Sequence, residues 1–236
     1  MVLHTLYGVF IAAVIMRWLS PKQRNRIIGR WSADLLRLLS IRVIVRGTPP
    51  PHDLRGVMFI ANHVSWVDIH ALNSVITTRF VAKAEILKWP VFGWFALKAN
   101  TLFIDRDNRH ATGKMTGLTR EALQAGDCIC VFPEGTTTDG TEVKPFKGSL
   151  LQAAIDAETT VWPFSIHYPD VDERPNIDMA YWGERSLMES MWLVIRQHRP
   201  VVVLNFTEPM PAKLYERRML ASEARAHIIK HLNLPG

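Results

Sequence analysis

The chain has 236 residues, of which 48% are hydrophobic and 21% are charged, and its formal net charge is +6. This balance excludes an intrinsically disordered chain, which combines low hydrophobicity with high charge. Two cysteines, Cys128 and Cys130, are too few for a disulfide-stapled scaffold or a cysteine-rich zinc module.

The basic excess lies at the N-terminal end. Residues 1–50 hold eight basic side chains and one acidic side chain, whereas residues 51–236 hold 20 basic and 21 acidic side chains. Such a segment is typical of proteins that bind nucleic acid or an anionic membrane. A nucleic-acid binder would interleave its basic residues with stacking aromatics or carry a recognition helix, whereas this segment follows an apolar run. We therefore expect membrane lipids, and no nucleic acid, as partners.

Residues 1–16 are nearly free of charge, but a helix of this length spans roughly 24 Å, less than the roughly 30 Å hydrocarbon core. Ser20 and Pro21 can begin a second helix, in which apolar residues recur at helical spacing and arginines fall largely on another face. This pattern indicates a helix in a membrane interface; the alternative is a helix packed on its own domain. We predict a membrane-anchoring helical segment over residues 1–40, at the cytoplasmic face of the inner or plasma membrane.

Residues 41–236 alternate between short apolar runs and helical patterns. The runs at 41–46, 56–61, 79–83, 101–104, 128–132, 161–166 and 201–206 predict strands, and the patterns at 111–125, 148–157 and 214–232 predict helices. This order predicts an α/β domain with a mixed, mostly parallel sheet flanked by helices, preceded by the N-terminal helical pair. Cys128 and Cys130 are two residues apart in a strand, so we expect buried thiols on one face.

The segment NHVSWVD at residues 62–68 directly follows a predicted buried strand. His63 and Asp68 would lie 140° apart on a regular helix, so they meet only if His63 precedes the helix. Ser65 would then be the N-cap, and Asp68 could fold back to accept a hydrogen bond from one His63 nitrogen. The other nitrogen would be free to take a proton from a hydroxyl. The alternative is that Asp68 only caps the helix.

Two further segments follow predicted strands. The sequence FPEGTTTDG at residues 132–140 predicts a tight loop with exposed amides, suited to an anion or an oxyanion, although an ordinary turn is the alternative. In FIDRD, Arg106 stands between two acids, which favours a solvated salt bridge when considered alone. Lys147 precedes a predicted helix start, where a phosphate could bind.

The ordered blocks NHVSWVD, FIDRD, FPEGTTTDG and VWPF, within residues 58–166, resemble the four-block signature of the glycerolipid acyltransferases. Within that superfamily the chain is similar to the 1-acyl-sn-glycerol-3-phosphate (lysophosphatidic acid) acyltransferases. The resemblance implies that residues 41–236 form an acyltransferase domain, with His63 as general base and Asp68 as the residue that orients it. It also implies that Arg106 holds the phosphate of the acceptor.

The third block is associated with acceptor binding, which the resemblance assigns to Glu134 and Gly135, with Thr136 beside them. Two positions depart from the usual pattern. Asn100 replaces a glycine, but asparagine tolerates left-handed backbone, so the turn can be kept. Thr137 stands where an arginine is common, which removes a bidentate phosphate donor. An acceptor such as a lyso-ornithine lipid therefore becomes an alternative.

These residues predict a membrane-associated O-acyltransferase that moves a fatty acyl group from a thioester to a lysophospholipid hydroxyl. We expect 1-acyl-sn-glycerol-3-phosphate as acceptor, phosphatidic acid as product, and acyl-CoA or acyl-carrier protein as donor. A neutral histidine with the ordinary pKa of about 6.5 can serve as base. The sequence lacks a G-x-S-x-G elbow, an H-E-x-x-H motif and a Walker loop, so it predicts no acyl-serine, metal or nucleotide cofactor. The alternative of another class is a non-catalytic membrane-bound scaffold.

Overall fold

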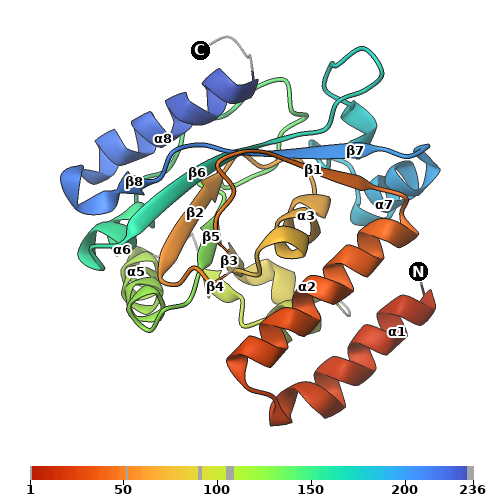
Figure 1. The fold of residues 1–236 in the computed structure, drawn as a ribbon, viewed down its shortest axis with the longest axis horizontal. Helices are drawn as coiled ribbons and strands as arrows, with labels where there is room; N and C mark the ends of the chain where they lie inside the picture. The colour runs from red at the N-terminus through yellow and green to blue at the C-terminus, as the bar shows by residue number, and fades with distance from the viewer. Residues whose placement is uncertain (1, 52, 90–91, 105–108, 233–236) are drawn as a thin grey trace.

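The computed structural model describes residues 2–51, 53–89, 92–104 and 109–232. Its centre is an eight-stranded sheet with helices on both faces (Figure 1). The strands are β1 (Arg42–Gly47), β2 (Val57–Ala61), β3 (Arg79–Lys83), β4 (Leu102–Ile104), β5 (Ile129–Val131), β6 (Thr160–His167), β7 (Val201–Phe206) and β8 (Met210–Pro211). The helices are α1 (Val2–Phe10), α2 (Pro21–Leu38), α3 (Val67–Val75), α4 (Phe92–Lys98), α5 (Arg109–Gln124), α6 (Leu151–Asp156), α7 (Leu187–Arg196) and α8 (Arg217–Leu232).

The strand order is β1-β7-β6-β2-β5-β3-β4, with β8 paired to β6. All neighbouring strands are parallel except for the antiparallel pairs that β6 forms with β7 and β8. The predicted mixed, mostly parallel sheet is therefore confirmed. Pro163 fits inside the central strand β6 because it lies between the segment that pairs with β8 and the segment that pairs with β7. A proline that cannot donate to the ladder is tolerated where the pairing changes.

Alternate residues of the central strand β2 serve two different cores. Phe59 packs with side chains of α2 and α3, whereas Met58 and Ile60 pack with side chains of α5, α6 and α8. All five residues of β2 are buried, as expected for a strand covered on both faces. Cys130 is buried and Cys128 half-buried, and both contact the core on the α2 and α3 side. The predicted shared face of the two thiols is confirmed.

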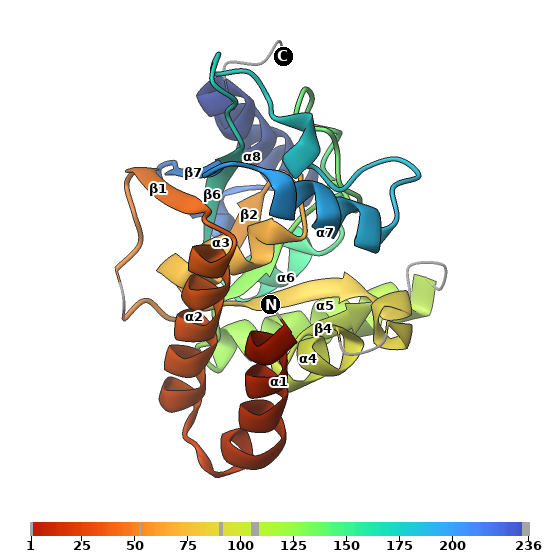
Figure 2. The same cartoon turned by 90° about the vertical axis from the view of Figure 1, so that its right-hand side faces the viewer.

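The N-terminal residues form two packed helices (Figure 2). After α1 the chain continues through a π-helical turn at Ile11–Ile15 and a 3-10 turn at Met16–Trp18. Ser20 caps α2 as predicted, because its hydroxyl accepts from the Gln23 amide while the Gln23 side chain accepts from the Ser20 amide. Gly8 allows α1 to approach α2, since a Cβ there would lie 2.5 Å from the Trp31 indole nitrogen.

The C-terminal half of α2 belongs to the main core, where Leu35, Leu36 and Leu39 are buried. The alternative of a helix packed on its own domain therefore describes this half of α2. Ile11, Ala12 and Met16 form a smaller cluster with side chains of α2 and α4. Within the part of the chain that the structure describes, no helix combines the length and apolar character needed to cross a bilayer. Membrane association of this segment remains a prediction.

All seven predicted strands are present, with bounds that differ by a residue or two. The predicted helices at 111–125 and 214–232 correspond to α5 and α8, whereas α6 is shorter than the predicted 148–157 because it begins at Leu151. The sequence analysis did not predict α7, although Ser186 is its N-cap and accepts a hydrogen bond from the Glu189 amide. A serine followed three residues later by glutamate is a usual helix-start signal.

Candidate active site

The candidate site lies where β2, β5 and β6 end. These three strands are mutually parallel, so their carboxyl ends meet at one edge of the sheet. The loop after β2 carries His63, the loop after β5 carries Glu134, and Tyr168 directly follows β6. The rings of His63 and Phe132 stack with their centroids 3.9 Å apart, which holds the first two loops against each other.

His63 and Asp68 meet as the sequence analysis predicted. The Nδ1 atom of His63 lies 2.7 Å from Oδ2 of Asp68. The imidazole keeps 19% of its side-chain surface exposed, whereas the carboxylate is fully buried. A hydrogen bond from Nδ1 to a carboxylate leaves the proton-free Nε2 as the acceptor of the ring. Among the described residues Nε2 has no hydrogen-bond partner, so it is available to a substrate.

The buried Asp68 carboxylate is satisfied by three further donors. Oδ2 accepts hydrogen bonds from the amides of Val64 and Ser65 at 2.8 and 3.0 Å. Oδ1 accepts one from the Tyr168 hydroxyl at 2.5 Å. Burial and the neighbouring Asp68 charge raise the pKa of Tyr168 well above its ordinary value, so the hydroxyl remains a donor. A fully hydrogen-bonded carboxylate can stay ionised inside a protein, and sequence reasoning did not identify Tyr168.

One detail of the predicted loop is wrong. The N-cap of α3 is Trp66, not Ser65, so Asp68 is the second helical residue and not the third. The Ser65 hydroxyl accepts only a long bond of 3.4 Å from the Val67 amide. The Asp68 carboxylate accepts from the Ser65 amide, which precedes the helix. Asp68 therefore holds both His63 and the backbone of the loop that leads into α3.

Asn62 fixes the start of the same loop. Its side-chain amide donates to the Ile166 carbonyl at 2.9 Å and accepts from the Ile166 amide at 2.8 Å. This buried, paired contact ties the end of β2 to β6, two residues before the tyrosine that holds Asp68. An aspartate or leucine could not make both bonds. The sequence analysis included Asn62 in the motif but assigned it no role.

Glu134 links two backbone segments. Its Oε1 accepts from the His63 amide and its Oε2 from the Lys144 amide, each at 2.8 Å. The side chain is buried, and this burial raises the pKa of Glu134 from 4.5 to about 7, although the two amides and the charges of His63 and Lys144 act in the opposite direction. Both carboxylate oxygens are thus used inside the protein. Glu134 positions the backbone of His63 near neutral pH, where its own charge changes.

The loop at 132–138 is a tight turn. Gly135 adopts a φ of 79°, a conformation that favours glycine, and its amide donates to the Phe132 carbonyl. The Thr138 amide donates to the His63 carbonyl at 2.9 Å. In the part of the chain that the structure describes, the amides of Thr136 and Thr137 have no protein acceptor. Two neighbouring free amides can stabilise a negatively charged oxygen.

The Thr137 hydroxyl is not free, because it donates to the Tyr181 carbonyl. The Tyr181 amide in turn donates to the Val64 carbonyl at 2.8 Å, next to His63. Thr137 therefore connects the loop after β5 with the segment that follows β6, and its side chain offers no hydroxyl donor to a phosphate. Thr136 is exposed.

A helix far along the chain also supports the site. Arg225 of α8 donates from Nε to the carbonyls of Val143 and Lys144 at 3.1 and 3.2 Å, and from Nη2 to Val143 at 2.5 Å. Lys144 is the residue whose amide Glu134 accepts. Arg225, which sequence reasoning did not identify, is therefore connected to the His63 backbone through one loop and one carboxylate. The Lys147 amide donates to the Pro133 carbonyl, while its side chain is exposed.

The structure leaves part of the predicted site untested. Arg106 lies outside the described residues, so its predicted contact with the acceptor remains a prediction. The turn before β4 is described, and Asn100 adopts a φ of 55°, which is the left-handed conformation expected of the residue that replaces glycine. The Asn100 carbonyl accepts from Nε of Arg79 at 2.8 Å.

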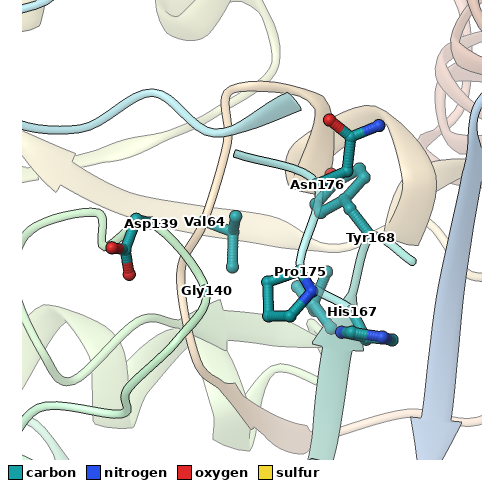
Figure 3. Close-up of a pocket in the computed structure, with 8 residues that line it drawn as sticks. Val64, Asp139, Gly140, His167, Tyr168, Pro175 and Asn176 are labelled. Atoms are coloured by element: carbon teal, nitrogen blue, oxygen red, sulfur yellow. The ribbon is translucent and has the colours of Figure 1, made fainter. Parts of the chain in front are cut away.

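A small pocket adjoins Val64, the residue that follows His63 in the chain (Figure 3). Its lining includes Val64 and Tyr168, which are the neighbours of His63 and Asp68 in the hydrogen-bond network, together with Asp139, His167 and Asn176. Burial lowers the pKa of His167. His63 itself does not line this pocket. The pocket therefore adjoins Val64 and Tyr168, which donate to Asp68, and not the Nε2 atom of His63.

Comparison with known proteins agrees with the signature blocks. The family described as Acyltransferase matches residues 42–167, more than half of the chain. A lyso-ornithine lipid O-acyltransferase of Pseudomonas aeruginosa is 35% identical over 205 residues, which are 86% of this chain and 76% of that protein. A 1-acyl-sn-glycerol-3-phosphate acyltransferase of Neisseria gonorrhoeae is 34% identical over 186 residues, which are 79% of this chain and 72% of that protein.

A solved structure has the same fold. The crystal structure of the 1-acyl-sn-glycerophosphate (LPA) acyltransferase of Thermotoga maritima aligns with a TM-score of 0.66 and 24% identity, covering 98% of this chain and 94% of that chain. At this identity the likeness concerns the fold alone. The sequence matches, by contrast, decide the family. The chain belongs to the acyltransferase family, in the group that contains the 1-acyl-sn-glycerol-3-phosphate and lyso-ornithine lipid acyltransferases.

Proposed function

We propose that this acyltransferase moves a fatty acyl group from an acyl thioester, acyl-CoA or acyl-carrier protein, to the free hydroxyl of a lysolipid, with His63 as the general base. The observation that carries the proposal is the bond of 2.7 Å between His63 Nδ1 and the buried Asp68 carboxylate. This bond fixes the tautomer whose Nε2 accepts a proton. It also stabilises the imidazolium that forms when the proton is taken up.

The geometry supports a direct transfer without a covalent enzyme intermediate. Nε2 of His63 takes the proton of the acceptor hydroxyl while the oxygen attacks the thioester carbonyl. The free amides of Thr136 and Thr137 are the donors we propose for the resulting oxyanion. When the tetrahedral intermediate collapses, the new C–O bond remains and the C–S bond breaks. The leaving sulfur takes the proton from His63, which restores the neutral base.

Two lysolipids are candidates for the acyl acceptor. We expect 1-acyl-sn-glycerol-3-phosphate to give phosphatidic acid, in line with the Neisseria relative. The second candidate is a lyso-ornithine lipid, the acceptor named for the Pseudomonas relative of nearly equal identity. One local observation favours this second candidate: the Thr137 hydroxyl is engaged by Tyr181, at a position where an arginine would offer a phosphate two donors. Arg106 and the exposed Lys147 are the cations that a phosphate would use.

We also propose that the N-terminal segment binds the membrane that holds the lysolipid. Residues of α1 and the turns after it leave large apolar side chains in solvent, with Leu3 82% and Trp18 77% exposed. Leu6, Tyr7, Phe10 and Val14 are also exposed and recur at helical spacing. Because α1 packs on Trp31 of α2, and the turns after α1 pack on α2 and α4, this segment has apolar contacts on its other side. The basic residues that follow support the cytoplasmic face of the membrane.

The test is an acyl-transfer assay in lipid vesicles with two donors, acyl-CoA and acyl-carrier protein, against a panel of lysolipids. His63→Ala should lower turnover by about 10³-fold or more, because a positioned general base contributes about 10² to 10⁴ in rate. It should still bind vesicles, because the proposed anchor lies elsewhere. His231→Ala, which changes an exposed histidine on α8, is the matched control and should retain full turnover.

The acceptor panel distinguishes the two candidates. Turnover with 1-acyl-sn-glycerol-3-phosphate and none with the lyso-ornithine lipid supports the first, and the reverse result supports the second. Arg106→Ala should harm a phosphorylated acceptor far more than an uncharged one. Turnover retained in His63→Ala would refute the general-base assignment for every acceptor.

A further inference from the structure

Helix α7 carries an exposed apolar stripe that the proposed reaction does not use. Met188, Trp192 and Ile195 are spaced by four and three residues, so they lie on one face of the helix. They are 73%, 60% and 45% exposed, whereas Ser190 and Val194 on the inner face are buried. A stripe of this kind on an otherwise well-packed domain marks an interaction surface.

Arginines lie at both ends of the stripe. Arg196 is exposed at the last residue of α7, and three residues later Arg199 lines a shallow open pocket together with Arg42 and Ser40. Before the helix, the Arg185 guanidinium lies 5.8 Å from the ring centre of the exposed Trp182. The acidic residues Glu184 and Glu189 lie at the N-terminal end of α7, and the Asp178 carboxylate accepts a hydrogen bond from Gln197 at its C-terminal end. Tryptophan beside arginine is the composition of surfaces that lie at the headgroup level of a membrane.

The position of α7 matches this composition. Figures 1 and 2, which view the molecule from directions 90° apart, both place α7 beside the N-terminal end of α1. Helix α7 therefore lies near the N-terminal end of α1, a helix whose exposed apolar side chains include Leu3 and Leu6. A surface that met only water would gain nothing from two such neighbouring patches.

We propose that α7 is a second membrane contact, in which Met188, Trp192 and Ile195 enter the bilayer interface and Arg185, Arg196 and Arg199 contact anionic lipid headgroups. The inference rests on the proposed function only in that the substrate is a lipid held in a membrane. One helix lying in an interface can rotate about its own axis, whereas two separate contacts fix the orientation of the domain above the bilayer. The α7 contact thus adds orientation as well as affinity.

The test is sedimentation of the full-length protein with vesicles of phosphatidylcholine, with and without phosphatidylglycerol. The double variant Met188→Ser and Trp192→Ser should partition into anionic vesicles about tenfold less than the wild type, because each large apolar side chain loses its transfer into the interface. The matched control is Leu214→Ser with Met219→Ser, which changes two exposed apolar residues beside α8 and should partition as the wild type does.

Two single variants separate the apolar contact from the charged contact. Arg199→Gln should lose part of the preference for phosphatidylglycerol, about threefold to tenfold, whereas Arg218→Gln, an exposed arginine of α8, should not. Trp192→Phe should keep vesicle binding and lose part of the fluorescence quenching by brominated lipids, while the quenching of Trp18 in the N-terminal segment remains.

Equal partitioning of the double variant and the wild type would overturn the proposal. A change of oligomeric state with unchanged partitioning would also overturn it, in favour of a contact between copies of the chain. Thermal midpoints within about 2 °C of the wild type show that each variant is folded, since these side chains are exposed. Turnover of the wild type in detergent micelles tests the proposed function separately, because no bilayer is present there.

Discussion

The loop at 62–68 and helix α1 differ in how completely the fold satisfies them. Around Asp68 every available donor is used: two backbone amides, one imidazole and one phenol converge on a carboxylate that has no contact with solvent. In α1 the reverse holds, because the apolar side chains of Leu3, Leu6 and Phe10 remain exposed to solvent. The loop is satisfied within the folded chain, whereas the exposed apolar side chains of α1 are the surface that we propose binds the membrane.

Removing the Tyr168 hydroxyl should disrupt the hydrogen-bond network around Asp68. Tyr168→Phe leaves Oδ1 of Asp68 buried without its donor, which costs about 1 to 3 kcal/mol of stability. We expect kcat to fall about tenfold to 100-fold, because the carboxylate no longer holds His63 in one orientation. The assay is acyl transfer in detergent micelles, where membrane binding plays no part.

The matched control for the phenol is Tyr215→Phe, which removes a hydroxyl from a half-buried tyrosine in the other core. It should leave kcat unchanged. If Tyr168→Phe retained wild-type kcat as well, the backbone amides alone would suffice to hold Asp68, and the tyrosine would have only a packing role.

Polar substitutions in α1 should weaken the proposed binding of this helix to a membrane. Leu6→Ser combined with Phe10→Ser should reduce vesicle partitioning about tenfold, since two exposed apolar side chains lose their transfer free energy. Turnover in detergent micelles should stay near wild type, whereas Tyr168→Phe should show the opposite result in both assays. Loss of micelle turnover in the α1 variant, with a normal thermal midpoint, would mean that α1 contributes to the chemical site.

Features that depend on residues close together in the chain were predicted from the sequence. Contacts that depend on which strands are neighbours in the sheet were not. The strands were predictable because apolar runs are bounded by Gly and Pro, and the contact between His63 and Asp68 was predictable because five residues can fold back. Tyr168 lies 100 residues after Asp68, and Arg225 lies 82 residues after Val143. These pairs meet only because β2 and β6 are neighbours and α8 covers one face. No spacing in the chain encodes such contacts.

Glu134 offers a sharper test, because its pH response affects stability and activity in opposite directions. Its folded pKa of about 7 lies above the ordinary 4.5, so the native state binds the proton more tightly than the unfolded chain. The resulting stability is fully present below about pH 4.5 and is lost as pH rises through about 7. The clamp on the His63 and Lys144 amides, in contrast, requires the charged carboxylate.

The variant Glu134→Gln removes this titration. Between pH 4.5 and 7.5 we expect the wild type to lose about 1 to 3 kcal/mol of stability relative to the variant, measured by urea unfolding at each pH. The variant should also have lower turnover, because its amide can accept from only one of the two facing N–H groups. Glu121→Gln, at an exposed position of α5, is the control. Parallel stability curves for Glu134→Gln and wild type would exclude a raised pKa.

The smallest expected effect concerns Arg225, which is the most remote support of the site. Arg225→Gln removes the guanidinium bonds to the carbonyls of Val143 and Lys144, so the loop that presents the Lys144 amide to Glu134 becomes less fixed. We expect kcat to fall about twofold to fivefold, with the acceptor KM nearly unchanged. Because the Lys144 amide stabilises charged Glu134, the pKa of Glu134 should rise further, and the loss of stability, which still begins near pH 4.5, should extend to higher pH.

Arg218→Gln, on the same helix, controls for the loss of a positive charge. Unchanged kcat and an unchanged stability curve in Arg225→Gln would mean that α8 only lies against the loop. A shifted stability curve would show instead that the hydrogen-bond network of the His63 loop extends through Glu134 and Lys144 to α8. Helix α8 would then support the site through hydrogen bonds within the domain, in contrast to α1, whose exposed side chains we propose bind a membrane.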